Sequence, residues 1–201
     1  MRSVTRRVAA ALAAATAALF LSSCGSPASD GHAGHEHADE PVITGQPAGY
    51  NADDVAFATN MIPHHQQAVD LSAMVPDRST NAGLVALAQQ ISAAQQPEIN
   101  VMKVFLVQWN ENPDINSGHA GHGNAMQGMV DAATMTKLES LTGAEFDKLW
   151  LESMIGHHQG AIEMAKAEIA NGDNVDAKNL AKNIVTTQEA EIGQMKQMVG
   201  G

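Results

Sequence analysis

Cysteine, aromatic residues and basic residues are all scarce in this chain of 201 residues. The single cysteine, Cys24, excludes an internal disulfide, and aromatic side chains make up only 3% of the sequence. There are 11 Lys and Arg against 22 Asp and Glu, which argues against nucleic acid as a partner because phosphate binding needs clustered basic side chains. Ala, Gln and Met are plentiful instead, and this composition favours helices over β-sheet.

The N-terminal stretch has the three parts of a secretory signal. Three arginines in "MRSVTRR" precede "VAAALAAATAALFL", which is too short for a stable membrane span, and "LSSC" ends at Cys24. "LSSC" resembles the bacterial lipobox, in which the cysteine is diacylated and becomes the mature N-terminus. We therefore expect residues 1–23 to be a lipoprotein signal peptide and Cys24 to anchor the protein on the extracytoplasmic face of the cell membrane. A free thiol on a conventionally cleaved protein is the alternative.

Removal of residues 1–23 would leave 8 basic and 22 acidic residues, a net charge of −14 that attracts cations. Residues 24–49 are rich in Gly, Pro, Asp and His, which predicts a flexible tether. The tether contains "GHAGH", and the same five letters recur at 118–122, followed by two methionines. Such tracts bind copper or zinc weakly and are expected to serve as auxiliary metal ligands. The residues concerned are His32, His35, His37, His119, His122, Met126 and Met129.

Residues 50–201 are predicted to form one all-α domain, since no segment alternates at the period of a strand. Helices are expected over about 51–75, 81–109, 131–140, 142–171 and 175–199. Thr142 and Glu145 have the spacing of a capping box at the start of the fourth of these helices. Gly172 is expected to end that helix in the left-handed conformation.

A long internal repeat organises this domain. Residues 54–102 align without a gap on residues 147–195, and 15 of the 49 positions are identical. The identities concentrate in Met-Ile-x-His-His-Gln and in the helix that follows each copy. The simplest account is a ferritin-like four-helix bundle built from two duplicated helical hairpins.

Each hairpin should bring a histidine pair and a glutamate to the same level. His157 lies about fifteen residues before the turn near Gly172, and Glu191 lies about sixteen residues after the next helix starts, so both are roughly 22–24 Å from the turn. The same arithmetic holds for His64 and Glu98. Neighbouring helical residues diverge by about 100°, so one histidine of each pair should face its own hairpin and the other the partner hairpin.

Imidazole and thioether together suit copper, above all Cu(I), with Cu(II) left open. The predicted metal ligands are Met61, His64, His65, Glu98, Met102, Met154, His157, His158, Glu191 and Met195. Four neighbours, Asp54, Gln95, Asp147 and Gln188, are expected to support these ligands. Two alternatives stay open: the glutamates orient histidines instead of binding metal, and the two aspartates serve only as helix-start residues. Satisfied core His–Glu pairs, with Met as packing, are the non-metal interpretation.

The quoted motifs carry a family resemblance. "MIPHHQQAVDLSAM" and "MIGHHQGAIEMAKA", followed by "QPEINVM" and "QEAEIGQM", resemble family 305 of the domains of unknown function over residues 50–199. That family is ferritin-like and often secreted or lipid-anchored in bacteria. Some members are periplasmic copper-binding proteins linked to copper resistance, so the resemblance implies copper binding or trafficking.

We therefore expect a lipid-anchored copper-binding protein and not an enzyme, because no nucleophile–base set and no Glu-x-x-His pair is visible. A copper-transfer protein is a candidate partner, and a homo-oligomer is left open. A metal-dependent oxidase is one rival hypothesis. The other is a non-metal helical bundle that acts as a protein-interaction module of the cell envelope.

Overall fold

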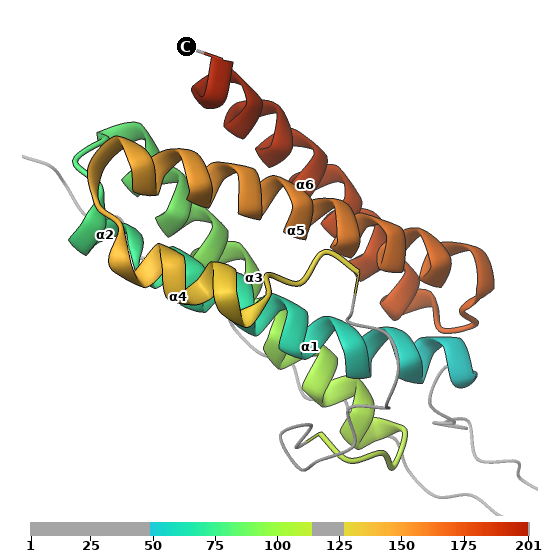
Figure 1. The fold of residues 1–201 in the computed structure, drawn as a ribbon. Helices are drawn as coiled ribbons and strands as arrows, with labels where there is room; N and C mark the ends of the chain where they lie inside the picture. Colours follow the sequence, from blue (N-terminus) through green and yellow to red (C-terminus); the bar gives the residue numbers. More distant parts are fainter. Residues whose placement is uncertain (1–48, 114–126, 201) are drawn as a thin grey trace, which may run out of the picture. The chain divides into compact units, whose positions relative to one another are not determined.

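The computed structural model describes residues 49–113 and 127–200, and these residues form six helices and no strand (Figure 1). The helices are α1 (Ala52–Ala73), α2 (Val75–Arg78), α3 (Ala82–Gln108), α4 (Ala132–Ser140), α5 (Gly143–Asn171) and α6 (Val175–Gly200). The prediction of an all-α domain is confirmed. None of these helices is both long and apolar enough to cross a membrane.

The four long helices pair as two hairpins, α1 with α3 and α5 with α6, and the hairpins pack chiefly through α1 against α5 (Figure 1). These two helices are antiparallel. Near the start of α5, the Trp150 indole nitrogen donates to the Leu71 carbonyl at the end of α1, at 2.8 Å. At the end of α5, the Asn171 carbonyl accepts from the side-chain amide of Asn51, which precedes α1. The predicted bundle of two duplicated hairpins is therefore confirmed. The short α4 packs on α5.

Asparagine caps begin three of the long helices. Asn51 caps α1 in a capping box with Asp54, because each side chain accepts a hydrogen bond from the other's backbone N–H. Asn81 and Asn174 occupy the same position in the two repeats, and the side-chain oxygen of each accepts from the first turn of α3 or α6. The repeat therefore preserved the caps as well as the histidines.

Two predicted helix ends are wrong. Thr142 is the N-cap of α5, but its side chain makes no capping hydrogen bond, so the expected capping box with Glu145 does not form. Gly172 ends α5 with φ −65° and ψ 156°, which is extended and not left-handed. What glycine supplies there is space, since a Cβ at this position would collide with the carboxylate of Glu168.

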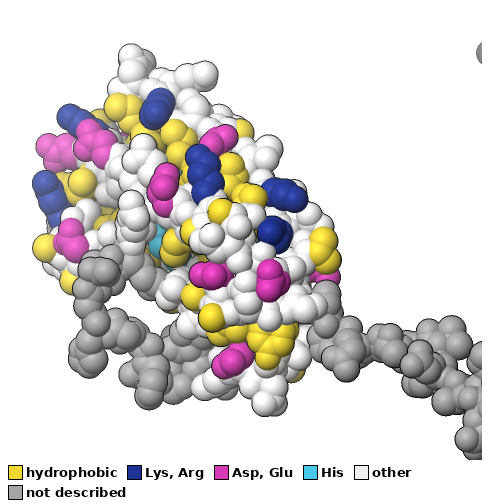
Figure 2. Space-filling model, turned by 90° about the vertical axis from the view of Figure 1, so that its right-hand side faces the viewer, with side chains coloured by type: hydrophobic (Ala, Val, Ile, Leu, Met, Phe, Trp, Pro, Cys, Tyr) yellow, Lys and Arg dark blue, Asp and Glu magenta, His cyan; other side chains and the backbone are white. Residues whose placement is uncertain are grey.

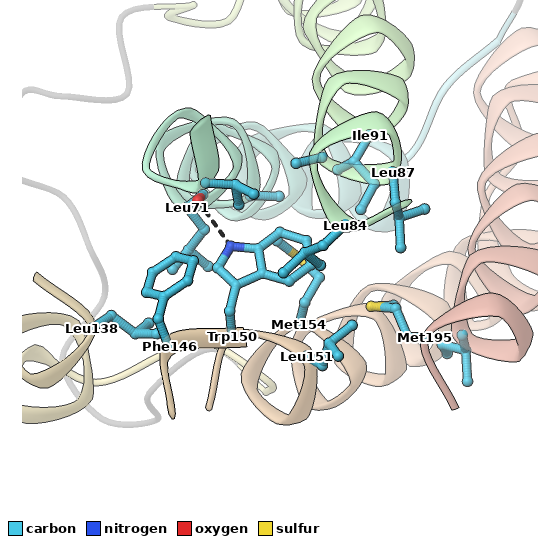
Figure 3. Close-up of a cluster of buried hydrophobic side chains, with 14 of the residues drawn as sticks. Leu71, Leu84, Leu87, Ile91, Leu138, Phe146, Trp150, Leu151, Met154 and Met195 are labelled. Carbon is cyan, nitrogen blue, oxygen red and sulfur yellow. Dashed lines mark hydrogen bonds between the residues drawn. The ribbon is translucent and has the colours of Figure 1, made fainter. Parts of the chain in front are cut away.

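The bundle has two apolar cores rather than one. The first joins the end of α1 and the starts of α3 and α5, with Trp150 at its centre (Figure 3). The second joins the start of α1 to the end of α3 and the start of α6, and contains Met61, Met102 and Ile184. Met154 and Met195 occupy the corresponding places in the first core. Burying each large apolar side chain contributes about 1.5–3 kcal/mol, so both ends of the bundle are held independently of the polar residues between them.

Candidate metal-binding site

A layer of polar side chains crosses the bundle between its two apolar cores. It contains the four histidines of the repeated motif and, from α3 and α6, one glutamine and one glutamate each. Its members are His64, His65, Gln95, Glu98, His157, His158, Gln188 and Glu191, and all but Glu98 are buried. The level predicted from helix lengths is confirmed, because the hydrogen bonds of this layer join residues 33 apart in each hairpin.

The outer members of the layer are two histidine–glutamate pairs. His65 Nε2 lies 2.7 Å from a carboxylate oxygen of Glu98, and His158 Nε2 lies 2.8 Å from one of Glu191. The Glu98 side chain is 19% exposed and the Glu191 side chain 2%. Both glutamates were predicted as metal ligands, with orientation of a histidine as the open alternative. The structure shows the hydrogen bonds to histidine, and metal binding by the glutamates stays a prediction.

The inner members of the layer are His64 and His157, which meet across the interface between the hairpins. Their ring centroids are 3.8 Å apart and the ring planes are tilted by 37°. The prediction that one histidine of each pair faces its own hairpin and the other the partner hairpin is confirmed. The duplication therefore brings two copies of one motif position into direct contact, which a single hairpin would not achieve.

Burial keeps the inner histidines neutral. Desolvation, followed by the nearby charge of His65, lowers the pKa of His64 to about 3, although the Gln127 carbonyl opposes the fall. Desolvation and the proximity of His64 also lower the pKa of His157 well below its usual value. The nearby backbone of His64 opposes this fall in the pKa of His157. Neither ring nitrogen of His157 makes a hydrogen bond. Neutral imidazole is the form that binds metal ions.

Many polar atoms of the layer lack a hydrogen-bond partner. Both ring nitrogens of His157, both amide atoms of Gln95, one amide atom of Gln188 and one carboxylate oxygen of Glu191 are buried and unpartnered. The Nδ1 atoms of His64, His65 and His158 are unpartnered as well. Such atoms are rare in folded proteins, and a concentration of them at one level needs a physical reason. A cation bound within the layer would supply one.

A buried methionine lies one helical turn from each inner histidine. Met61 precedes His64 by one helical turn and Met154 precedes His157 by one turn, and both are fully buried. Because α1 and α5 are antiparallel, the two methionines lie on opposite sides of the pair along the bundle. Within residues 49–113 and 127–200, no three His, Cys, Asp or Glu side chains are placed together to hold a metal ion.

The remaining predicted residues are dispersed. Met102 and Met195 each lie one turn beyond the glutamate of their helix, buried in an apolar core. Asp54 belongs to the N-terminus of α1, about 15 Å along the helix from His64, and accepts hydrogen bonds from the backbone of Asp173 and Asn174. It is therefore a helix-start residue and does not support a histidine. Asp147 is half-buried with one oxygen unpartnered.

The predicted auxiliary ligands lie mostly outside the described residues. Met129 is described and is half-buried. The predicted signal peptide, tether and lipid anchor remain predictions for the same reason. The residues outside the described part are Cys24, His32, His35, His37, His119, His122 and Met126.

Five residues near the inner pair were missed at the level of sequence. The carbonyl of Gln127 lies 3.3 Å from His64 Nε2, the side chain of Gln67 binds the backbone of Val130, and Gly128 lies close against Gly160. One signal could have pointed to them: Gly160 replaces Gln67 directly after the preserved His-His-Gln of the repeat.

Comparison with known proteins places this architecture in a family. A family model described as "Domain of unknown function (DUF305)" matches residues 54–199. The chain belongs to the DUF305 family. The resemblance inferred from the repeated motifs is thereby confirmed, and the match spans both hairpins and the connection between them. No curated protein matches the chain.

Solved structures of DUF305 proteins share the fold. A DUF305 protein from Streptomyces coelicolor is 32% identical, with a TM-score of 0.67 over 74% of this chain and 91% of that one. A DUF305 fragment from Deinococcus radiodurans is 30% identical, with a TM-score of 0.66 over 75% of this chain and 97% of that one. CopM in its Cu(II)-bound form is 33% identical, with a TM-score of 0.63 over 73% and 95%. CopM has also been solved in Cu(I)-bound and Ag-bound forms.

Proposed function

We propose that this DUF305 protein binds copper ions outside the cytoplasmic membrane and sequesters them or hands them on. The observation that carries the proposal is the inner pair, two neutral buried histidines in contact across the hairpin interface with a methionine one turn from each. Two imidazoles and two thioethers are a donor set that favours Cu(I) over zinc, magnesium or calcium.

The comparison with CopM supports the choice of metal. CopM is described in Cu(I)-, Cu(II)- and Ag-bound forms, and Ag(I) and Cu(I) share a preference for soft donors. In the proposed site, Cu(I) is the preferred ion. His65 and His158, each held by a glutamate, would bracket the inner pair and limit how far the rings can turn.

The proposed location rests on the N-terminal sequence. A lipoprotein signal and Cys24 would place the domain on the outer face of the membrane, tethered by residues 24–49. One relative, the Streptomyces coelicolor protein, is named as a candidate secreted protein. The acidic composition would concentrate cations near the domain.

Burial of the polar layer favours holding an ion over catalysis. All four motif histidines are at most 1% exposed, so a substrate has little room to reach an ion bound among them. A metal-dependent oxidase needs an open coordination position that oxygen can reach. We therefore propose that the protein is not an enzyme, and oxygen consumption by the copper-loaded protein would contradict this.

The test is a competition for Cu(I). The protein beginning after Cys24, with both "GHAGH" tracts changed to remove their histidines, is titrated anaerobically against a chromophoric Cu(I) chelator. It is compared with a variant in which His64, His65, His157 and His158 are all replaced by Asn, with circular dichroism to verify the helices. We expect the first protein to compete with the chelator and the second not to compete. Failure of both to compete would make the polar layer structural and favour the protein-interaction module.

A further inference from the structure

A short segment crosses the bundle beside the inner histidine pair. Residues 127–130, which we call the strap, run between α1 and α5 and lead into α4 (Figure 1). The Gln127 carbonyl lies 3.3 Å from His64 Nε2. A small area of histidine is visible on one face of the molecule, recessed below the surrounding side chains (Figure 2). The strap therefore touches the layer that we propose as the copper site.

The strap is attached on both sides. On the α1 side, the Gln67 amide makes two hydrogen bonds to Val130, donating to its carbonyl at 2.9 Å and accepting from its N–H at 2.8 Å. On the α5 side, Gly128 adopts φ +86°, and a Cβ there would lie 2.7 Å from the carbonyl oxygen of Gly156. A Cβ on Gly160 would collide with the Gln127 carbonyl, so only glycine lets the strap lie this close.

The two attachment points occupy the same position in the repeat. Gln67 and Gly160 are equivalent residues, two and three places after identical histidines, yet each has the chemistry that its own side of the strap requires. A pure duplication would have left the same residue at both positions. The divergence gives each helix a residue that fits its own contact with the strap, which indicates that the position of the strap is specified on both helices.

Contact with the strap determines which nitrogen of His64 carries the proton. A backbone carbonyl can only accept a hydrogen bond, so His64 Nε2 is the protonated nitrogen and donates to Gln127. His64 Nδ1 is then the nitrogen with a free lone pair, and it is buried without a partner. His65 and His158 also engage Nε2 and leave Nδ1 unpartnered, with glutamates in the place of the carbonyl.

We propose that the strap is a positioning element of the copper site, which holds His64 as the Nε2–H tautomer and presents Nδ1 to the ion. Gln67 and Gly160 are positioning residues that act through the strap. This inference rests on the proposed copper binding. A carbonyl that orients a ligand histidine is a common arrangement at metal sites, and loss of such a partner typically weakens metal affinity by about 10–100-fold.

Two matched pairs of variants isolate the strap. Gln67→Ala removes both hydrogen bonds to Val130, whereas Gln66→Ala changes the neighbouring exposed glutamine, whose amide donates to Asp70 at 3.0 Å. Gly160→Ala forces Gln127 away, whereas Gly156→Ala, one turn earlier on α5, meets nothing within 4 Å. Within each pair the chemical change is the same, but only Gln67→Ala and Gly160→Ala are expected to displace the strap. Circular dichroism verifies that all four variants keep the helices.

Two measurements on these four variants decide the proposal. Long-range proton–nitrogen NMR of the metal-free protein reports the tautomer of His64, assigned by loss of its signals in His64→Asn. We expect the Nε2–H form in the unchanged protein and in Gln66→Ala and Gly156→Ala, and a mixture in Gln67→Ala and Gly160→Ala. In the chelator competition, we expect Cu(I) affinity to fall about tenfold or more in the last two variants only.

The outcomes separate this proposal from the one it rests on. If the unchanged protein binds Cu(I) and the strap variants bind it equally well, or if His64 is the Nδ1–H tautomer, the strap does not position the ligand and the inference is wrong. If the unchanged protein does not bind Cu(I), the proposed function itself fails and the role of the strap at a copper site fails with it. In that case the tautomer comparison still shows whether the strap orients His64.

Discussion

His64 and His157, two copies of one motif position, lie with their ring centroids 3.8 Å apart across the interface between the hairpins. Each is followed in the sequence by a second histidine, and that second histidine is hydrogen-bonded to a glutamate of its own hairpin. The duplication thus separates the four histidines into two that are hydrogen-bonded to glutamates and two that face each other across the hairpin interface. This division of roles organises the proposed site.

Replacement of Met61 and Met154 by Leu should weaken Cu(I) binding by at least tenfold and affect Cu(II) less, because thioether sulfur prefers the softer ion. Leu has nearly the volume of Met, so we expect the free energy of unfolding to change by less than about 1.5 kcal/mol. Chelator competition and urea denaturation measure the two effects. Met164→Leu, on the same helix as Met154 but half-buried at the edge of a core, is the control and should change neither.

Acid should destabilise the metal-free protein below about pH 6.5. The pKa of His64 is about 3 in the folded protein and near its ordinary value of 6.5 when unfolded, and the pKa of His157 shifts in the same direction. Between these values the unfolded state binds more protons, so stability falls as the pH falls, by about 1.4 kcal/mol per pH unit for each histidine. Urea denaturation at pH 7.5, 5.5 and 4.5 measures the slope.

A His64→Asn variant provides the check on that assignment. Removing one of the two groups should reduce the acid slope by about half, while the rest of the protein's titration is unchanged. An unchanged slope in the variant would mean that other groups, and not the inner pair, bind the protons released on folding.

Glu168 should make the protein less stable as the pH rises from about 4.5 to 8. Burial and the neighbouring carboxylate of Asp54 raise the pKa of Glu168 to about 8, against the opposing charge of Lys178. A raised pKa means that the folded protein holds a proton which the unfolded chain releases, so stability is lost as the pH passes through this range. Glu168→Gln keeps a donor beside Asp54 without a titrating proton and should remove this dependence. Denaturation of both proteins at pH 6 and pH 9 measures the difference, and equal slopes would contradict the prediction.

The two histidine–glutamate pairs should differ in strength. Both histidine side chains are fully buried, but Glu191 is 2% exposed and Glu98 is 19% exposed, so water can replace the lost carboxylate more readily beside His65 than beside His158. We expect Glu191→Ala to lower the free energy of unfolding by about 3 kcal/mol and Glu98→Ala by about 1 kcal/mol. Thermal and urea denaturation compare the two directly. Because the helices around them are repeat-equivalent, each variant serves as the control for the other, and equal losses would show that exposure does not set the strength.

Much of this arrangement could be predicted from the sequence because it depends on helix geometry alone. A fixed rise per residue sets the level of His157 against Glu191, and a fixed angle between neighbours sends His157 and His158 to different partners. The repeat then implies that the first hairpin does the same. These inferences need only that the helices form and pair, and the apolar spacing and asparagine caps make them do so.

Other features depended on distances that no local pattern contains. Gly172 was predicted to supply a left-handed conformation, but it supplies room for Glu168, a residue four places earlier that lies near Asp54 of another helix. Asp54 was predicted as a candidate support for the histidines, yet it binds the turn between α5 and α6. Each of these roles arises from contact between segments more than 100 residues apart.

The sequence by itself determined the helices, their pairing and the level at which the histidines and glutamates meet, because these follow from periodicity and duplication. Only the tertiary structure decided that His64 meets His157, that the glutamates hold the outer histidines, and that residues 127–130 reach His64. The physical reason is that these contacts depend on how two hairpins and a connecting segment pack against one another. Their packing is the sum of many side-chain contacts, and no single stretch of sequence specifies it.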